Sequence, residues 1–251
     1  STNGALVIKV FDASGLPVVG ANINIVNNDV SPAIDLDDVT DASGVLTIVD
    51  APPSVNGYQI IVTKDGYSTD RTYAVGETSN PNPSKPNITV VVQQISQVSF
   101  AIDKLSTVNF TVTDNKCVGV SGFDFNMHGD KLIGTTPDVY KYSQSLLTDS
   151  SGILSLSNLE WDTYTMNITD TANDIIGTNP FFNLGLSIDP DTEQNIKIFT
   201  APKSGRRLLV AVLDSTTNLP ASDVTVTLTN SSGYDKTIVS DEEYLNQTDW
   251  S

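Results

Sequence analysis

The residues with the clearest capacity for chemistry are four aspartates close together near the start of the chain, Asp35, Asp37, Asp38 and Asp41. Carboxylate oxygens are the ligands that Ca²⁺ prefers, so this cluster is the candidate metal site and calcium is the only cofactor considered. The spacing does not follow the EF-hand pattern D-x-[DN]-x-[DN]-G. A solvated acidic loop on an acidic protein is the alternative interpretation.

Groups suited to catalysis are few. The single histidine, His128, precedes Gly129 and Asp130 in an expected turn, and the sequence contains no nucleophile elbow, metalloprotease motif, phosphate-binding loop or dinucleotide-binding glycine motif. The single cysteine, Cys117, follows Lys116, whose charge would lower the pKa of the thiol, but a lone cysteine near a strand end is typically a small buried residue. The sequence therefore predicts that the chain is not an enzyme.

Three aromatic residues are candidates for a platform that binds a sugar ring: Trp161, Tyr140 and Tyr142. The two tyrosines alternate, so they share one face of a strand, where burial is an equally good interpretation. Trp161 comes just before a strand and is expected in the core or at a seam between domains. Five N-x-S/T motifs would suit a secreted glycoprotein, at Asn87, Asn109, Asn167, Asn230 and Asn246.

The charge balance is strongly acidic, with 30 Asp and Glu residues against 13 Lys and Arg, for a formal net charge of −17. Such a surface repels nucleic-acid phosphates and anionic headgroups, so we expect no nucleic-acid partner and no direct membrane insertion of this segment. No apolar run approaches the roughly 20 residues that a membrane span needs. Because there is one cysteine, no internal disulfide can form, and stability must come from packing.

The elements that would position these residues are short strands. Alternating apolar runs at 5–12, 21–26 and 59–63 predict strands with one buried face, bounded by turns rich in Gly, Pro, Asn and Asp. The order of strands and turns begins again near residues 106 and 206. Since a sandwich closes at about 100 residues, the chain is predicted to be all-β, with tandem immunoglobulin-like or transthyretin-like β-sandwich domains.

Three repeats are predicted, two complete sandwiches at 1–97 and 98–203 and an incomplete one at 204–251. Segment 90–110 lacks Gly and Pro and should join the first two stiffly, whereas 201–207 has the composition of a short hinge. A half sandwich leaves apolar strand faces to be covered. Two explanations stay open: truncation of a longer chain, or completion in trans by a neighbouring subunit, which would produce a homo-oligomer.

The recurring T-D-x-S-G motif is interpreted as a turn. It occurs at 40–44 and 148–152, and Thr248-Asp249 is taken as its start in the third repeat. An Asp side chain bonds nearby backbone N–H groups, and Gly supplies a positive φ. Tyr58 and Tyr164 occupy positions typical of a corner tyrosine, with the ring in the core and the hydroxyl on the backbone.

Taken with the first strand, the motifs D-x-x-G-x-P-V-x-G-A, T-D-x-S-G, G-Y-x-I and V-x-K-x-G-Y, at 12–21, 40–44, 57–60 and 62–67, resemble the carboxypeptidase regulatory-like domain. This domain is a transthyretin-like β-sandwich of bacterial surface proteins, and the match is best over 5–92. Segment 100–164 is also similar to the extracellular part of prepilin-type surface proteins. The resemblance implies a non-catalytic stalk, spacer or accessory that binds carbohydrate or protein.

A related fold, the B-type repeat of Gram-positive pilins, carries a Lys–Asn or Lys–Asp crosslink with a buried glutamate. Lys9 and Asn87 lie in the strands that such a crosslink would join, but the strand expected to carry the glutamate, 60–63, reads I-I-V-T. Lys9 is therefore interpreted as a solvent-facing residue.

We predict a non-enzymatic, extracellular structural or adhesive module of a cell-surface protein, such as a stalk, spacer or pilus component. The alternative is a carbohydrate-binding accessory module of a larger secreted enzyme. The expected partners are other protein subunits or surface polymers, including carbohydrate, outside the cell.

Overall fold

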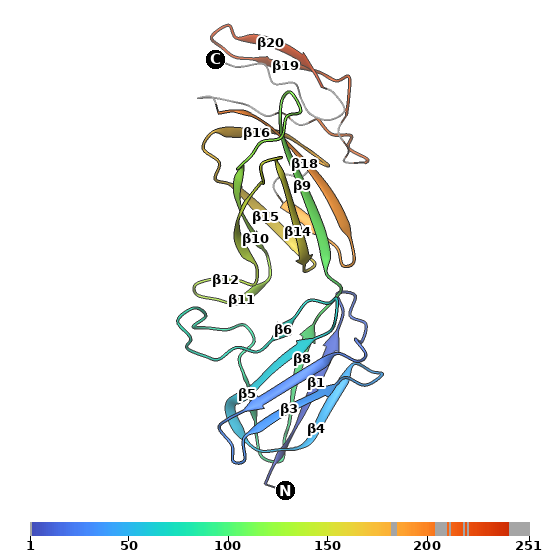
Figure 1. Ribbon diagram of the computed structural model, residues 1–251, viewed down its shortest axis with the longest axis vertical. Helices are drawn as coiled ribbons and strands as arrows, with labels where there is room; N and C mark the ends of the chain where they lie inside the picture. Colours follow the sequence, from blue (N-terminus) through green and yellow to red (C-terminus); the bar gives the residue numbers. More distant parts are fainter. Residues whose placement is uncertain are drawn as a thin grey trace.

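The computed structural model describes residues 2–181, 185–203, 210, 212–217, 219 and 221–240. Every regular element within these residues is a β-strand, which confirms the predicted all-β fold. No helix long and apolar enough to cross a membrane occurs among them. Two sandwiches stand end to end along the long axis, and a short hairpin lies beyond the second (Figure 1).

The first sandwich consists of two sheets that face each other across one core. One sheet has the strand order β4 (Val45–Ala51), β1 (Gly4–Phe11), β8 (Ile95–Ala101). The other has the order β3 (Ile34–Val39), β2 (Asn22–Asn27), β5 (Ser54–Thr63), β6 (Asp70–Arg71), and β7 (Ile88–Val90) also pairs with β5. Buried and half-buried residues alternate along β1, as expected for a strand with one face on a core.

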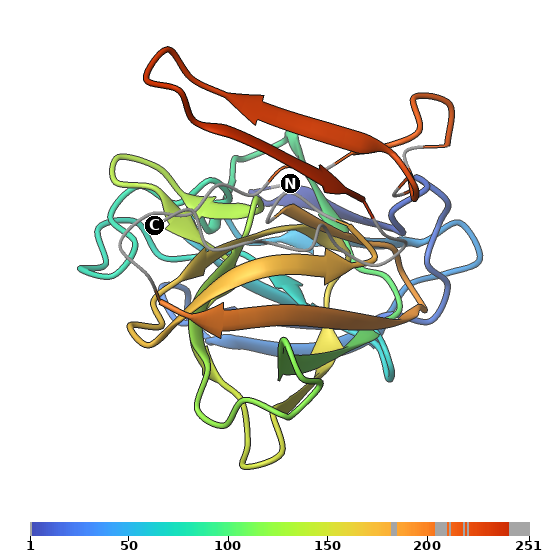
Figure 2. The same cartoon turned by 90° about the horizontal axis from the view of Figure 1, so that it is seen from above.

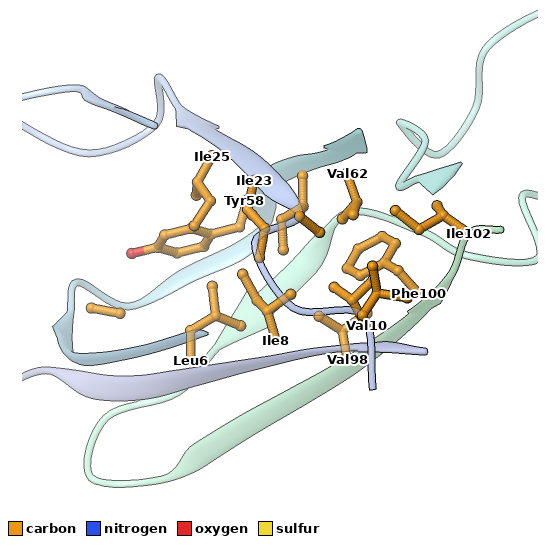
Figure 3. Packing of buried hydrophobic residues seen from close by; sticks show 14 of the residues in the cluster. Leu6, Ile8, Val10, Ile23, Ile25, Tyr58, Val62, Val98, Phe100 and Ile102 are labelled. Atoms are coloured by element: carbon orange, nitrogen blue, oxygen red, sulfur yellow. The ribbon is translucent and has the colours of Figure 1, made fainter. Parts of the chain in front are cut away.

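The core of the first sandwich is filled by aliphatic side chains from both sheets. Leu6 and Ile8 of β1 lie opposite Ile23 and Ile25 of β2, and all four are fully buried (Figure 3). Burying side chains of this size contributes about 1.5–3 kcal/mol each relative to leaving them exposed. The apolar alternation in the sequence thus becomes the main source of stability.

The first core extends further along the chain than the boundary predicted at residue 97. Val98, Phe100 and Ile102 all belong to it, because β8 is the strand that closes the sandwich. The apolar run at 88–92, which would close a sandwich ending at residue 97, contains only the short strand β7, and a turn at 91–94 follows it. This turn contains no Gly or Pro, although Gln93 adopts φ 58°, so the amino-acid composition gave no sign of a turn here.

The second sandwich repeats this plan. One sheet has the order β14 (Ile153–Leu159), β9 (Ser106–Asp114), β18 (Glu193–Pro202), β16 (Asn173–Asn179). The other has the order β13 (Ser143–Leu147), β10 (Asp124–Gly129), β15 (Asp162–Ile168), β17 (Gly185–Ile188). A small hairpin of β11 (Leu132–Gly134) and β12 (Val139–Tyr140) projects between β10 and β13. A separate core, which includes Phe110 and Phe125 with ring centroids 5.5 Å apart, fills this sandwich.

In each sandwich the strand by which the chain enters lies beside the strand by which it leaves, and the two run parallel. β1 pairs with β8 from Ala5–Ile95 to Phe11–Ala101. β9 pairs with β18 from Thr107–Glu193 to Asp114–Thr200. The points at which the chain enters and leaves each sandwich therefore lie at opposite ends of one ladder.

The T-D-x-S-G motifs form turns, as predicted. The Asp41 carboxylate accepts from the backbone N–H groups of Ser43 and Val45, and Gly44 follows at φ 69°. Asp149 accepts in the same way from Ser151 and Ile153.

The hydroxyl residue before the Asp ties two strands together. Its hydroxyl donates to the backbone carbonyl of one residue and accepts from the backbone N–H of the residue three positions after that one. The hydroxyl, carbonyl and amide residues are Thr40, Val18 and Ala21; Thr148, Val120 and Phe123; and Ser240, Ala221 and Val224. The third set shows that Ser240 takes the place of Thr40. Thr248 and Asp249, predicted to begin the third motif, lie outside the described residues.

The described part of the third repeat is a hairpin of β19 (Thr225–Thr229) and β20 (Asp235–Val239). It lies at the end of the molecule opposite the N-terminus and to one side in the view along the long axis (Figures 1 and 2). Residues 204–209, 211, 218, 220 and 241–251 of this repeat lie outside the described residues, so the incomplete repeat stays a prediction.

Candidate functional site

The four predicted calcium ligands do not converge. Asp35, Asp37 and Asp38 lie on β3, where successive side chains point to opposite sides, and all are exposed. Asp37 accepts from the Asn24 side chain at 2.9 Å, and Asp41 is engaged in its own turn. Among the residues that the structure describes, no group of three His, Cys, Asp or Glu side chains is placed to hold a metal ion.

The acidic run has a structural explanation instead. β3 is the edge strand of its sheet, and its outer backbone groups are open to pairing with another chain. Asp38 pairs with Ile23 across the ladder, so it lies on the core side of this edge, where an apolar residue would be expected. Charged residues on an edge strand oppose edge-to-edge association.

His128 and Cys117 lie in different parts of the second sandwich, His128 in β10 and Cys117 in the turn after β9. The His128 ring stacks on Tyr140, with 4.2 Å between the ring centroids. Cys117 is exposed at φ 61° in the turn after β9, so its interpretation as a buried residue was wrong. The Asp114 carboxylate accepts from the backbone N–H groups of Val118 and Lys116 in this turn, and these bonds lower the pKa of Asp114.

The three candidate aromatic residues do not share one exposed face. Tyr142 packs edge-on against Tyr164, with 5.3 Å between the ring centroids. Tyr140 contacts His128, and Trp161 lies between the sandwiches under the ammonium group of Lys131. Of the two positions expected for Trp161, the seam between domains is therefore the observed one.

The predicted corner tyrosines are confirmed. The hydroxyl of Tyr58 donates to the Pro52 carbonyl at 2.6 Å, and that of Tyr164 donates to the Glu160 carbonyl at 2.7 Å. Both rings are fully buried in their cores. Burial is the main reason that the pKa of Tyr164 lies well above its usual value.

The residues considered for a crosslink are separated. Lys9 alternates with Ile8 and Val10, whose side chains are fully buried in the core, so Lys9 points away from it. Asn87 is buried next to β7, which belongs with the opposite sheet. Burial also makes Asn87 a poor glycan acceptor, whereas Asn167 is exposed. Asn246 lies outside the described residues.

The feature that sequence reasoning missed is the joint between the sandwiches. The backbone from Ile102 to Leu105 passes directly from β8 to β9, and bonds to the first sandwich hold it on both sides. The Ser68 N–H donates to the Asp103 carbonyl at 2.8 Å, and the Leu105 N–H donates to the Gly66 carbonyl at 2.9 Å. Stiffness was predicted for this segment, but from the absence of Gly and Pro rather than from these bonds.

A second connection, here called the clasp, joins residues 80–84 of the first sandwich to residues 133–136 of the second. The Ser84 N–H donates to the Ile133 carbonyl at 2.9 Å, and the Thr135 N–H donates to the Asn82 carbonyl at 3.0 Å. The buried Asn80 amide donates to Ile133 as well, at 3.0 Å. Because the clasp and the backbone joint are separate connections, they resist bending together.

A crevice lies beside the clasp and is lined by both sandwiches, with a volume of about 260 Å³. Glu160 of the second sandwich forms ion pairs with two ammonium groups, Lys131 at 2.8 Å and Lys141 at 2.6 Å. Lys85 pairs with Asp70 in the first sandwich. Burial lowers the pKa of Lys131 below its usual value despite the bond to Glu160.

Comparison with known proteins leaves the family open. No family model matches the chain, and no curated protein matches it, so the resemblance to the carboxypeptidase regulatory-like domain stays a prediction.

Similar solved structures include the Bacillus anthracis TIE protein, at 13% identity and TM-score 0.32 over 98% of this chain. They also include a streptococcal ancillary pilin, at 14% identity and TM-score 0.34 over 81% of it. GBS52, the minor pilin of Streptococcus agalactiae, matches at 12% identity and TM-score 0.35 over 82% of this chain and 98% of its own. The chain covers 43% of the first structure and 64% of the second. TM-scores this low carry no function from these proteins to this chain.

Proposed function

We propose that this chain is a force-transmitting spacer in a cell-surface protein, outside the cell and without catalytic activity. The observation that carries the proposal is the parallel pairing of the entering and leaving strands in both sandwiches, β1 with β8 and β9 with β18. Each pairing extends along nearly the whole length of the entering strand.

Parallel pairing decides how a pulling force reaches the hydrogen bonds. Tension enters the first sandwich at the start of β1, at Gly4, and leaves at the end of β8, at Ala101. In a parallel pair these two points lie at opposite ends of the ladder, so the strands are pulled past each other and the inter-strand bonds are loaded together. An antiparallel pair held at adjacent ends would instead open one bond at a time.

The stacking of the sandwiches transmits this force in line. The two ends of the described chain lie at opposite ends of the long axis, and both ladders run between them (Figure 1). The joint at 102–105 and the clasp hold the second sandwich on the first at two places. Side chains bonded across the joint, such as Lys104 with Asp191, add to this.

The surface location and the partners of the spacer belong to the same proposal. The resemblance to surface-protein domains supports an extracellular chain that joins other protein subunits or surface polymers, and the acidic charge opposes nucleic-acid partners. The alternative, a carbohydrate-binding module, would need an exposed aromatic platform, and the candidate aromatic residues are engaged with other side chains.

The proposal is tested by stretching single molecules held at residues 2 and 203. Each sandwich should unfold in one abrupt step, because its ladder fails as a unit, and should release roughly 300 Å of chain at about 3.5 Å per residue. Gradual lengthening at low force, without two such steps, would contradict a force-transmitting role.

A further inference from the structure

Cationic side chains are concentrated in the crevice between the sandwiches. Four of the chain's 13 Lys and Arg residues line it: Arg71, Lys85, Lys131 and Lys141. Two come from each sandwich, although they are separated by up to 70 residues in sequence (from 71 to 141). On a chain with a net charge of −17, such a gathering of positive charge needs an explanation.

The carboxylates in the crevice do not balance these cations. Only Asp70 and Glu160 line it with them, which leaves four positive charges against two negative ones. Asp162 lies in the adjoining hollow, and its oxygens already accept from the backbone N–H groups of Lys131 and Thr163. Even with Asp162 counted, the cations exceed the carboxylates by one.

The pairing inside the crevice leaves donor capacity free. Glu160 is shared by two ammonium groups, so one carboxylate serves two half-buried cations. Arg71 lies over the Tyr73 ring at 4.7 Å, and only its Nε donates, to the Thr72 carbonyl at 3.3 Å. No residue within the described part of the chain accepts from the terminal nitrogens of Arg71. A guanidinium with free terminal nitrogens presents a fork that fits two oxygens of one group.

We propose that this crevice binds an oxyanion, a carboxylate or phosphate group, between Arg71 of the first sandwich and the lysine pair of the second. The anion would accept from cations of both sandwiches and would brace the joint. The two aromatic faces in the crevice are already covered, Tyr73 by Arg71 and Trp161 by Lys131 at 3.1 Å, so recognition rests on charge rather than on ring stacking. Anion binding is measured in solution without a pulling force, so its failure would leave the proposed mechanical role untouched.

The test is a titration of the folded chain, followed by NMR of backbone amides, with inorganic phosphate in one series and glucuronate in another. Sodium chloride keeps the ionic strength constant. The matched variants are Arg71→Gln and Lys116→Gln. Each removes one positive charge from an exposed residue, but Lys116 lies in the distant turn after β9. Arg71 forms no ion pair with a carboxylate, so Arg71→Gln leaves no carboxylate without its partner.

We expect saturable chemical-shift changes that are confined to amides around the crevice. The affinity should be unchanged in Lys116→Gln and about tenfold weaker in Arg71→Gln, as for the loss of one charge-assisted hydrogen bond. The series that saturates identifies the oxyanion. Shifts that grow linearly with anion concentration, spread over the surface or are equal in the two variants would overturn the proposal.

Discussion

The clasp gives the sharpest prediction about the joint. A Cβ atom at Gly134 would lie 1.8 Å from Asn80 Oδ1 and 2.8 Å from its Cγ. It would also lie 3.2 Å from the Asn82 carbonyl oxygen. Gly134→Ala must therefore displace Asn80, whose amide is buried and donates to the Ile133 carbonyl. Displacing a buried hydrogen-bonded amide costs about 1–3 kcal/mol.

That cost falls on the contact between the sandwiches, because Gly134 and Asn80 belong to neither hydrophobic core. Both sandwiches should stay folded while the joint loosens. Distances between spin labels measure this directly, with one label on the exposed Cys117 and one on Thr47→Cys in β4. We expect a narrow distance distribution in the parent chain and a broad one in Gly134→Ala.

Gly185→Ala is the matched control. Gly185 lies in β17, and a Cβ atom there meets nothing within 4 Å, so this variant should keep the narrow distribution. If Gly134→Ala also keeps the narrow distribution, with an unchanged melting temperature, the clasp does not hold the sandwiches and the reasoning is refuted.

Three further predictions concern the turns and the edge strand. The double variant Asp37→Thr/Asp38→Val, which removes two charges from the edge strand β3, should associate in a concentration-dependent way in light scattering. A variant that stays monomeric would contradict the view that these charges oppose edge-to-edge association. Cys117→Gly should raise the free energy of unfolding by about 1 kcal/mol in denaturant titration, because Gly adopts φ 61° without strain. Gly15 occupies the matching position in the first sandwich. An unchanged free energy of unfolding would count against backbone strain at Cys117. The hydrogen bonds of its turn lower the pKa of Asp114, so the stability that its carboxylate contributes should be present above the ordinary pKa of 3.8 and be lost as the pH falls below it. Melting curves from pH 5 to 2 should therefore depend less on pH in Asp114→Asn than in the parent chain. An equal pH dependence in the variant would exclude Asp114 as the cause.

Local features of this chain could be predicted because their causes are local. The alternation in 5–12 places Leu6 and Ile8 on one face, and a single Asp and Gly determine each turn. The corner tyrosines follow for the same reason. The acidic run was not predicted as a strand because Asp38 breaks the alternation that begins at Ile34, although 34–39 pairs with β2 throughout. In this strand Asp35 and Asp37 point to one side and Asp38 to the other.

Features that depend on distant pairing were not predicted. The clasp joins Asn80 to Ile133, and the crevice brings Arg71 near Lys141, across separations that no periodicity reveals. The one available signal was the scarcity of cations on an acidic chain: six of the 13 fall from residue 71 to residue 141, and four of these six line the crevice. The parallel pairing of β1 with β8 likewise follows from how the sheets close.

The direction of pulling tests the central claim most directly. In a Cys117→Gly background, attachments at Thr2→Cys and Lys203→Cys load β1 against β8 along the ladder, whereas Thr2→Cys and Pro53→Cys hold the adjacent ends of the antiparallel strands β1 and β4. The account predicts a severalfold higher unfolding force for the first sandwich in the end-to-end geometry, because its bonds must fail together. Equal forces in the two geometries, or a higher force between residues 2 and 53, would contradict it.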